Sequence, residues 1–244
     1  GRVQLQPARL GVGVERAARV YRSGWKRSVV LTFLQPILVL SAMGLGVGAL
    51  VDRSAAVLPG HVSYVAFLAP GLLAATCMQS ASFESSFPVH GRLVWHGSYL
   101  AMAGTPMGIL DIVLGELAWV GVRLTFLATA FLLVAMSFGA APGWLGLMAV
   151  PAAVLTGLAF SACVLAYSGT LGRSGNYNAM FRFIITPLAL FSGVYFPIER
   201  MPALLQQAAW LTPLYHGVSL TRGASLQTLT WAEAAGHTAY LVLM

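Results

Sequence analysis

The sequence predicts an all-α integral membrane protein that crosses the bilayer several times. Of its 244 residues, 58% are hydrophobic and only 9% are charged, and the mean hydropathy is +0.78. A soluble domain of this size carries about a quarter charged residues. The chain is also divided into long apolar runs by short polar connections, and a helix needs roughly 20 apolar residues to span a bilayer.

We expect one transmembrane domain over residues 1–244. Its spans cover about 29–50, 62–82, 117–138, 145–171 and 183–196, and a sixth, truncated span begins near 236. Gly44 and Gly48 lie one turn apart in the first span, a spacing typical of a surface that packs against another helix. Arg123 lies near the start of the third span, where it either snorkels to the interface or pairs with Glu116.

The basic residues predict the orientation. Seven of the 14 lie within the first 27 residues, in a leader (1–28) whose residues 14–27 have the pattern of an amphipathic helix lying in the membrane interface. With the N-terminus inside the cell, ten basic residues fall on inner segments and three on outer ones. We therefore expect a multi-pass protein of the plasma membrane with a cytoplasmic N-terminus and contacts to lipid. The clustering does not indicate nucleic-acid binding.

No catalytic, cofactor-binding or metal-binding motif is recognisable. The single lysine, Lys26, follows a tryptophan and excludes a phosphate-binding loop of the form GxxxxGK[ST]. Neither HExxH nor GxSxG occurs. The five histidines show no metal-ligand spacing with acids or cysteines. Asp111 and Glu116 are poorly spaced for one helical face. We expect no enzyme activity on this chain.

The segment between the second and third spans is too long for a simple turn. Pro88 and Gly91 are expected to break its start. Trp95, Tyr99 and Met102 then recur at the spacing of a short amphipathic helix, and Thr105 with Pro106 has the pattern of a further helix start. The aromatic side chains anchor either a protein partner or the headgroup layer, and the residues alone leave both open.

Two stretches resemble the ABC-2 type permeases. The segment "FESSFPVHGRLVWHGSYLAMAGTPMGILDIVLGELAW" is similar to the loop that joins their second and third spans. The segment "FSGVYFPIERMPALLQQAAWLTPLYHGVSLTRG" is similar to their C-terminal signature. The resemblance extends over almost the whole chain and is strongest to permeases of the nodulation type, which export lipo-oligosaccharides, and of the daunorubicin-resistance type.

The resemblance implies a six-span ABC-2 fold, that of a type V ABC exporter. It implies a homodimer of this chain with two separate ATP-binding subunits, which would hold the ATP and magnesium; no cofactor is expected on this chain. It also implies a cytoplasmic coupling helix that docks into the ATP-binding subunit, and an N-terminal interfacial helix that touches the same subunit. The residues expected at this contact are Glu84, Arg92, Trp95, His96 and Tyr99.

The resemblance further implies that short helices re-enter the membrane on the outer side, over residues 197–223. Pro197 and Pro202 are expected to end the fifth span. Residues 203–211 then lie at shallow depth, with Gln206 and Gln207 facing outward. We hypothesise that this segment forms a gate at the outer end of the path; the alternative is a simple amphipathic anchor. The gate residues would be Phe196, Pro197, Pro202, Leu205, Pro213 and His216.

The predicted function is ATP-driven export of an amphipathic or lipid-linked molecule along a mostly apolar path between the first and fifth spans. Lipo-oligosaccharide, polysaccharide, lipid and hydrophobic drug all fit this prediction. A secondary transporter or channel is the first alternative, but it favours acids near the centres of the spans, where we expect none. A membrane-embedded enzyme or a non-transporting scaffold is the other.

Overall fold

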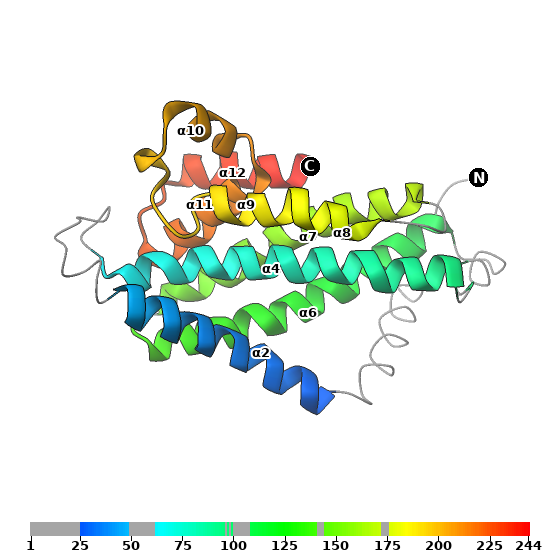
Figure 1. The fold of residues 1–244 in the computed structure, drawn as a ribbon, viewed down its shortest axis with the longest axis horizontal. Coiled ribbons are helices and arrows are strands. Elements are labelled where there is room, and N and C mark those ends of the chain that lie inside the picture. Colours follow the sequence, from blue (N-terminus) through cyan, green and yellow to red (C-terminus); the bar gives the residue numbers. More distant parts are fainter. Residues whose placement is uncertain are drawn as a thin grey trace.

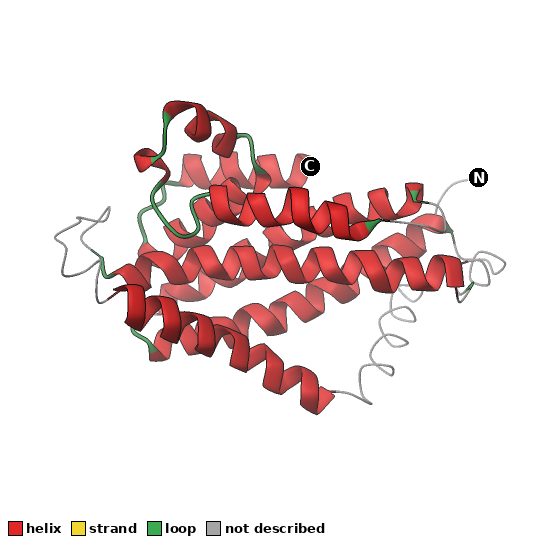
Figure 2. Ribbon diagram, viewed as in Figure 1, coloured by secondary structure: helices red, strands yellow, loops and turns green. Residues whose placement is uncertain are grey.

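The computed structural model describes residues 25–48, 62–95, 97, 99, 108–140, 144–171 and 176–244. Within these ranges the chain forms helices joined by loops, and no strand occurs among them (Figure 2). The predicted all-α class is therefore confirmed. The interfacial helix expected over residues 14–27 lies outside the described residues except for its last three positions. The helix start expected at Thr105 and Pro106 also lies outside them.

Among the residues that the structure describes, three helices are long and apolar enough to cross a membrane. They are α4 (Tyr64–His90) with its π-helical extension η3 (Gly91–Trp95), α6 (Ile109–Ser137), and α7 (Ala149–Thr170), which follows the 3-10 turn η4 (Trp144–Met148). Before them comes α2 (Trp25–Val39), which continues as the π-helix η1 (Leu40–Val47). α6, the helix of the expected third span, begins before the expected Leu117 because Asp111 accepts a hydrogen bond from the Gly108 N–H and caps its first turn.

Shorter helices make up the C-terminal third. They are α8 (Tyr177–Met180), η5 (Phe181–Ile185), α9 (Thr186–Phe191), η6 (Ile198–Arg200), α10 (Ala203–Trp210), α11 (Pro213–Leu226) and α12 (Trp231–Leu243). Side-chain caps fix where several helices begin: Ser63 caps α4, Thr212 caps α11, and Thr230 forms a capping box with Glu233 at α12.

The bundle has two ends, which we name after the residues of α4 and η3 that lie there, the Tyr64 end and the Trp95 end. α2 and α6 run antiparallel to α4, and α7 runs parallel to it (Figure 1). Gly44 and Gly48 of the first helical run face Val65 and Tyr64 of α4, which confirms the predicted small-residue contact. The segment with α10 projects from the bundle at the Tyr64 end (Figure 1).

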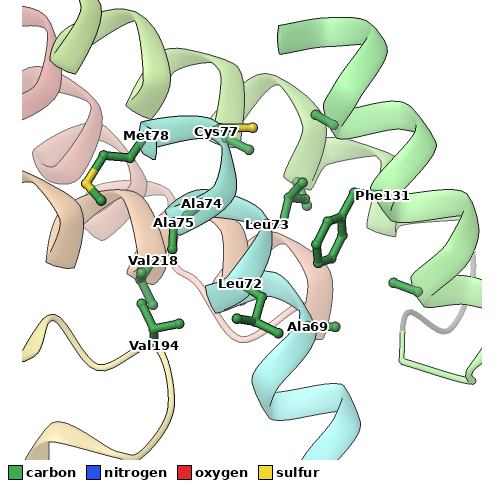
Figure 3. Packing of buried hydrophobic residues seen from close by; sticks show 14 of the residues in the cluster. Ala69, Leu72, Leu73, Ala74, Ala75, Cys77, Met78, Phe131, Val194 and Val218 are labelled. Atoms are coloured by element: carbon green, nitrogen blue, oxygen red, sulfur yellow. The ribbon is translucent and has the colours of Figure 1, made fainter. Parts of the chain in front are cut away.

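α4 is the centre of the molecule. It packs against α6, α7, α11 and η1, so most of its side chains are buried; the exceptions, among them Gln79, Phe83 and Phe87, share one face of the helix. Leu73 and Phe131 meet between α4 and α6, while Val194 and Val218 close the core on the side of α11 (Figure 3). A helix that is enclosed in this way supplies a rigid support on which polar groups can be held in fixed positions.

Two predicted helix ends are wrong. α4 continues through Pro88 to His90 and then as η3 to Trp95, although a proline removes the N–H that would bond the Glu84 carbonyl; Arg92 Nε donates to the Pro88 carbonyl on the next turn. The helix of the fifth apolar run ends at Phe191 rather than Phe196. Gly193 follows with a φ of 76°, a left-handed conformation that turns the chain out of the helix.

Candidate functional site

A cavity of about 500 Å³ opens between α2, α4, α6 and the η5–α9 run. Thr76 lies 12 residues after Tyr64, a distance of about 18 Å along a helix and so close to the middle of a bilayer core about 30 Å thick. From there the cavity extends toward the Trp95 end. Its lining consists of Gln35, Thr76, Gln79, Ser80, Phe83, Glu84, Pro88, Arg123, Phe181, Ile185 and Thr186.

An ion pair joins two walls of this cavity. Arg123 Nη1 of α6 lies 3.0 Å from Glu84 Oε1 of α4. The second carboxylate oxygen, Glu84 Oε2, is buried and has no hydrogen-bond partner among the described residues. Arg123 was expected to snorkel or to pair with Glu116; its ion pair in this structure is with Glu84, and Glu116 pairs with Arg92. Glu84 and Arg123 lie on different helices and far apart in the sequence, so no sequence pattern predicted their contact.

Four further polar side chains line the cavity without a partner. Gln35, Thr76, Gln79 and Ser80 make no side-chain hydrogen bond to any residue that the structure describes. Buried or membrane-embedded polar groups are normally paired, since each unpaired group costs free energy in apolar surroundings. Gln35 and Gln79 are exposed and Thr76 and Ser80 are half-buried, so in a membrane these groups would take a ligand, water or another chain as their partner.

The predicted ATPase-contact residues separate into two places. Arg92, Tyr99 and Glu116 form one network at the Trp95 end: Arg92 Nη1 lies 2.7 Å from Glu116 Oε1, and the Tyr99 hydroxyl donates to the same oxygen at 2.8 Å. Trp95 beside them is 72% exposed. Glu84 instead lies in the cavity, 11 residues before Trp95 along α4 and η3. His96 lies outside the described residues.

The sequence predicted that Trp95 and Tyr99 share one helical face, and this prediction is wrong. Gly97 stands between them with a φ of 57°, which interrupts a right-handed helix. Trp95 consequently points outward while Tyr99 is 9% exposed and lies against Glu116. One aromatic ring is thus available to a partner, and the other ties this segment to α6.

At the Tyr64 end, residues 193–211 form an excursion whose two ends are held together. Ser192 Oγ lies 3.0 Å from Thr212 Oγ1, at the end of α9 and the start of α11. Gln206 does not face outward as predicted: its amide donates to the carbonyls of Glu199 and Met201. Leu204 and Leu211 of this excursion are 79% and 75% exposed, so apolar surface is presented to the surroundings.

The predicted gate residues are spread over this excursion and α11. Pro197, Pro202 and Pro213 stand at the starts of η6, α10 and α11 rather than at the end of a spanning helix. Phe196 and Leu205 are about 40% exposed, whereas Pro197 is buried. Proline at the start of a helix is favourable because its N–H would be unpaired there.

His216 has a partner that the sequence did not indicate. Its Nδ1 lies 2.7 Å from Nδ1 of His237 on α12, and its Nε2 lies 3.0 Å from the Trp210 carbonyl. The Tyr240 ring stacks on the His216 ring with centroids 3.9 Å apart. This cluster connects α10, α11 and α12.

Arg222 is the other residue whose environment the sequence did not predict. It was expected on an outer connection, but it lies on α11, where Nε donates to the Phe67 carbonyl at 3.1 Å and Nη2 donates to the Gly193 carbonyl at 2.9 Å. The guanidinium also lies 3.8 Å above the Phe67 ring. It thus ties α4, α11 and the end of α9 together.

The helical bundle, its three helices of membrane-spanning length and the polar cavity inside it define an integral membrane protein. A family model described as "ABC-2 type transporter" matches residues 10–226. The chain belongs to this family of transport subunits, which are not themselves catalytic.

Similar proteins with curated descriptions carry the name "Nodulation protein J". The protein from Rhizobium leguminosarum bv. trifolii is 34% identical over 204 residues, 81% of this chain and 75% of the relative. That from R. leguminosarum bv. viciae is 33% identical over 83% of this chain and 78% of the relative. That from Azorhizobium caulinodans is 26% identical over 85% and 80%. The predicted family resemblance is confirmed.

Proposed function

We propose that this chain is the permease subunit of an ATP-driven exporter that moves an amphipathic or lipid-linked molecule out of the cytoplasm. Two copies of the chain would assemble with two ATP-binding subunits, which bind ATP and magnesium. The proposal places six spans in the plasma membrane with the N-terminus in the cytoplasm, so that the Trp95 end faces the cytoplasm and the Tyr64 end faces outward.

The observation that best supports transport is the polar cavity. It lies between α2 and the η5–α9 run, the helices of the first and fifth apolar runs, at about the middle depth of an otherwise apolar bundle. The polar part of an amphipathic molecule needs hydrogen-bonding groups when it leaves water, and this wall provides them. The expectation of a mostly apolar path is revised accordingly.

Coupling to ATP is assigned to the Trp95 end. An exposed tryptophan on a short, charged helical segment is suited to a partner groove, because large aromatic side chains contribute strongly to protein interfaces. The Arg92–Glu116 ion pair and the Tyr99 hydrogen bond connect this segment to α6. A displacement of Trp95 by the ATP-binding subunit would therefore reach α6, which also carries Arg123 of the cavity.

The test is affinity purification of the chain from native membranes in the presence of ATP and magnesium. A soluble ATP-binding subunit is expected at near one-to-one stoichiometry. Trp95→Ala should reduce its recovery several-fold, while Trp231→Ala, which removes a 93% exposed tryptophan at the start of α12, should leave recovery unchanged. Repeated isolation of the intact chain without an ATP-binding subunit would contradict the proposal.

One observation favours a secondary transporter as the second candidate. Glu84 lies on a membrane helix and lines a cavity, and intramembrane acids frequently serve as ion or proton sites. Arg123 neutralises it in this structure, which weakens that reading. Transport in proteoliposomes that follows an imposed proton gradient and ignores ATP would support the second candidate against the first.

A further inference from the structure

We propose that His90 and Tyr177 transmit the movement of Trp95 to the η5–α9 wall of the cavity, by forming a hydrogen bond between the Tyr177 hydroxyl and Nδ1 of His90. Both are positioning residues for transport, and their route is separate from the Arg92–Glu116 connection to α6. This inference rests on the proposed function and adds to it the residues through which the ATP-binding subunit acts on the cavity.

Ring contacts lead from Trp95 to the start of the fifth helical run. The His90 ring, at the end of α4, meets the Trp95 ring edge-on with centroids 5.9 Å apart. It also meets the Tyr177 ring edge-on, with centroids 5.4 Å apart. Tyr177 is the first residue of α8, where the helical run that continues as η5 and α9 begins. His90 therefore contacts both the exposed tryptophan and the first turn of that run.

The contacts continue from Tyr177 to the cavity wall. Tyr177 and Phe181 lie four residues apart, on one face of their helix, and both contact Phe87 of α4, with ring centroids 5.1 and 6.0 Å from that of Phe87. The Phe181 ring then meets the Phe83 ring at 6.4 Å, and these two rings line the cavity. A shift of Tyr177 therefore displaces Phe181 at the wall.

The junction between His90 and Tyr177 holds two unpaired polar atoms. His90 is 4% exposed, and its Nδ1 is buried without a hydrogen bond among the described residues, as is the Tyr177 hydroxyl. Ser168 lies beside that hydroxyl but directs its own proton to the carbonyls of Ser85 and Val164. Each buried group without a partner costs free energy. One hydrogen bond, donated by the Tyr177 hydroxyl to His90 Nδ1, removes both costs.

The backbone on both sides of this junction is able to change its arrangement. His90 is followed directly by the π-helix η3, and Phe181 begins the π-helix η5. A π-helical turn holds an additional residue, and such turns are frequent at functional sites. Because π-helical and α-helical hydrogen bonds can replace each other, the side chains can rotate there while the chain stays helical. The junction thus has the second state that transmission between two sites requires.

The ATP-binding subunit supplies the bias between the two states. A partner shifts such an equilibrium only if it interacts differently with each state. Trp95 is 72% exposed and meets the His90 ring edge-on. A partner groove that encloses Trp95 moves it relative to His90, so the bound subunit favours the state in which the His90 ring turns to accept the hydrogen bond from Tyr177.

The experiment follows the reactivity of a cysteine at the cavity wall. Thr186, which is exposed and lines the cavity, is replaced in Thr186→Cys, with Cys77→Ala and Cys163→Ala as the background. The complex with the ATP-binding subunit, in lipid nanodiscs, reacts with a water-soluble maleimide without nucleotide and with magnesium and a non-hydrolysable ATP analogue. We expect nucleotide to change the labelling rate about two- to tenfold, the shift that one neutral hydrogen bond produces. Tyr177→Phe, which keeps the ring and removes the hydroxyl, should abolish most of this change.

Tyr167→Phe is the matched control. The Tyr167 ring of α7 meets the Tyr177 ring edge-on at 6.2 Å, so this variant removes a hydroxyl from the same cluster but not from the route between Trp95 and Phe181. It should keep the full response to nucleotide. His90→Asn, which retains a hydrogen-bond acceptor near the position of Nδ1, should keep part of the response, whereas His90→Leu should lose it.

The outcomes separate this inference from the proposed function. A full response in Tyr177→Phe, an equal loss in Tyr167→Phe, or no response in the parent complex would overturn the route. So would additive losses in the combined His90→Leu and Tyr177→Phe variant, because the two substitutions remove the same hydrogen bond. Every variant should recover the ATP-binding subunit as the parent does, and its loss from Tyr177→Phe would also overturn the route. Failure of the parent to recover any such subunit would instead count against the proposed function.

Discussion

Arg222 shows how a single charge can organise a helical core. Arg222→Met removes charge-assisted hydrogen bonds to the Phe67, Gly193 and Val194 carbonyls, the last a long one at 3.4 Å, and the contact with the Phe67 ring. Because each such bond contributes about 1.5–3 kcal/mol, we expect the free energy of unfolding to fall by about 3 kcal/mol. Thermal unfolding in detergent should show a lower Tm than for Arg182→Met, which alters an exposed arginine on η5; equal values would contradict this role.

His216 predicts a dependence of stability on pH. Burial lowers the pKa of His216 below its ordinary value, and the neighbouring His237 lowers it further, while the hydrogen bond with the Trp210 backbone partly opposes both. The unfolded chain therefore binds this proton more readily than the folded chain. The contribution to stability is complete above the ordinary histidine pKa of about 6.5 and declines as the pH falls through that value.

The measurement is the Tm of the purified chain at pH 8 and pH 5. We expect a lower Tm at pH 5, and a smaller difference in His237→Asn, because the second ring no longer opposes protonation of His216. Glu233, one turn before His237, stays in place in both proteins and serves as an internal reference for other charges. An unchanged pH difference in the variant would show that the histidine pair is not responsible.

At the scale of elements, close helix contact depends on small residues. Gly217 of α11 faces Thr156 of α7, and a Cβ at this position would overlap the threonine side chain. Gly217→Ala should therefore force the helices apart and destabilise the protein by about 1–3 kcal/mol. Gly236→Ala on α12, where nothing lies within 4 Å of the added Cβ, should be neutral or stabilising by up to about 1 kcal/mol. The Tm of both variants, measured by thermal unfolding, tests these two expectations. Equal changes in Tm would contradict the packing argument.

The elements also show which features can be inferred from a sequence. Apolar runs long enough to span a bilayer located α4, α6 and α7, because their length and composition are local properties. Helix ends were less certain, because Pro88 was tolerated inside α4 and Gly193 rather than Pro197 ended the α9 run. Whether a helix continues or ends at such a position depends on the backbone conformation there. A proline or a glycine is compatible with both outcomes, so the residue type alone does not decide.

The pairing between elements was beyond the reach of sequence patterns. Glu84 was expected beside Arg92 and Trp95, yet it pairs with Arg123, and its neighbour in the cavity, Gln35, comes from α2. Such contacts depend on how helices pack and rotate about their axes, and no single sequence fixes that by periodicity alone. The candidate site became recognisable only when four elements were placed around one cavity.

At the scale of the whole molecule, the excursion over residues 193–211 can be tested apart from the bundle. Deleting residues 203–207 shortens α10 but leaves the Ser192–Thr212 contact and the core around α4 in place. We expect a Tm close to that of the parent and loss of export in proteoliposomes that contain the ATP-binding subunit. Full export by the shortened chain would show that this segment is an anchor and not a gate.

The contact between Ser192 and Thr212 has a consequence for how this protein can vary. The two ends of the excursion are joined by a hydrogen bond between Ser192 and Thr212. The residues between them therefore form a loop whose ends are held in place by the helical bundle. The entropy of closing such a loop grows only slowly with its length, so longer or shorter inserts impose little penalty on the helices below. Related sequences can therefore vary this segment, and an experimenter can place a reporter there, while the bundle keeps its packing.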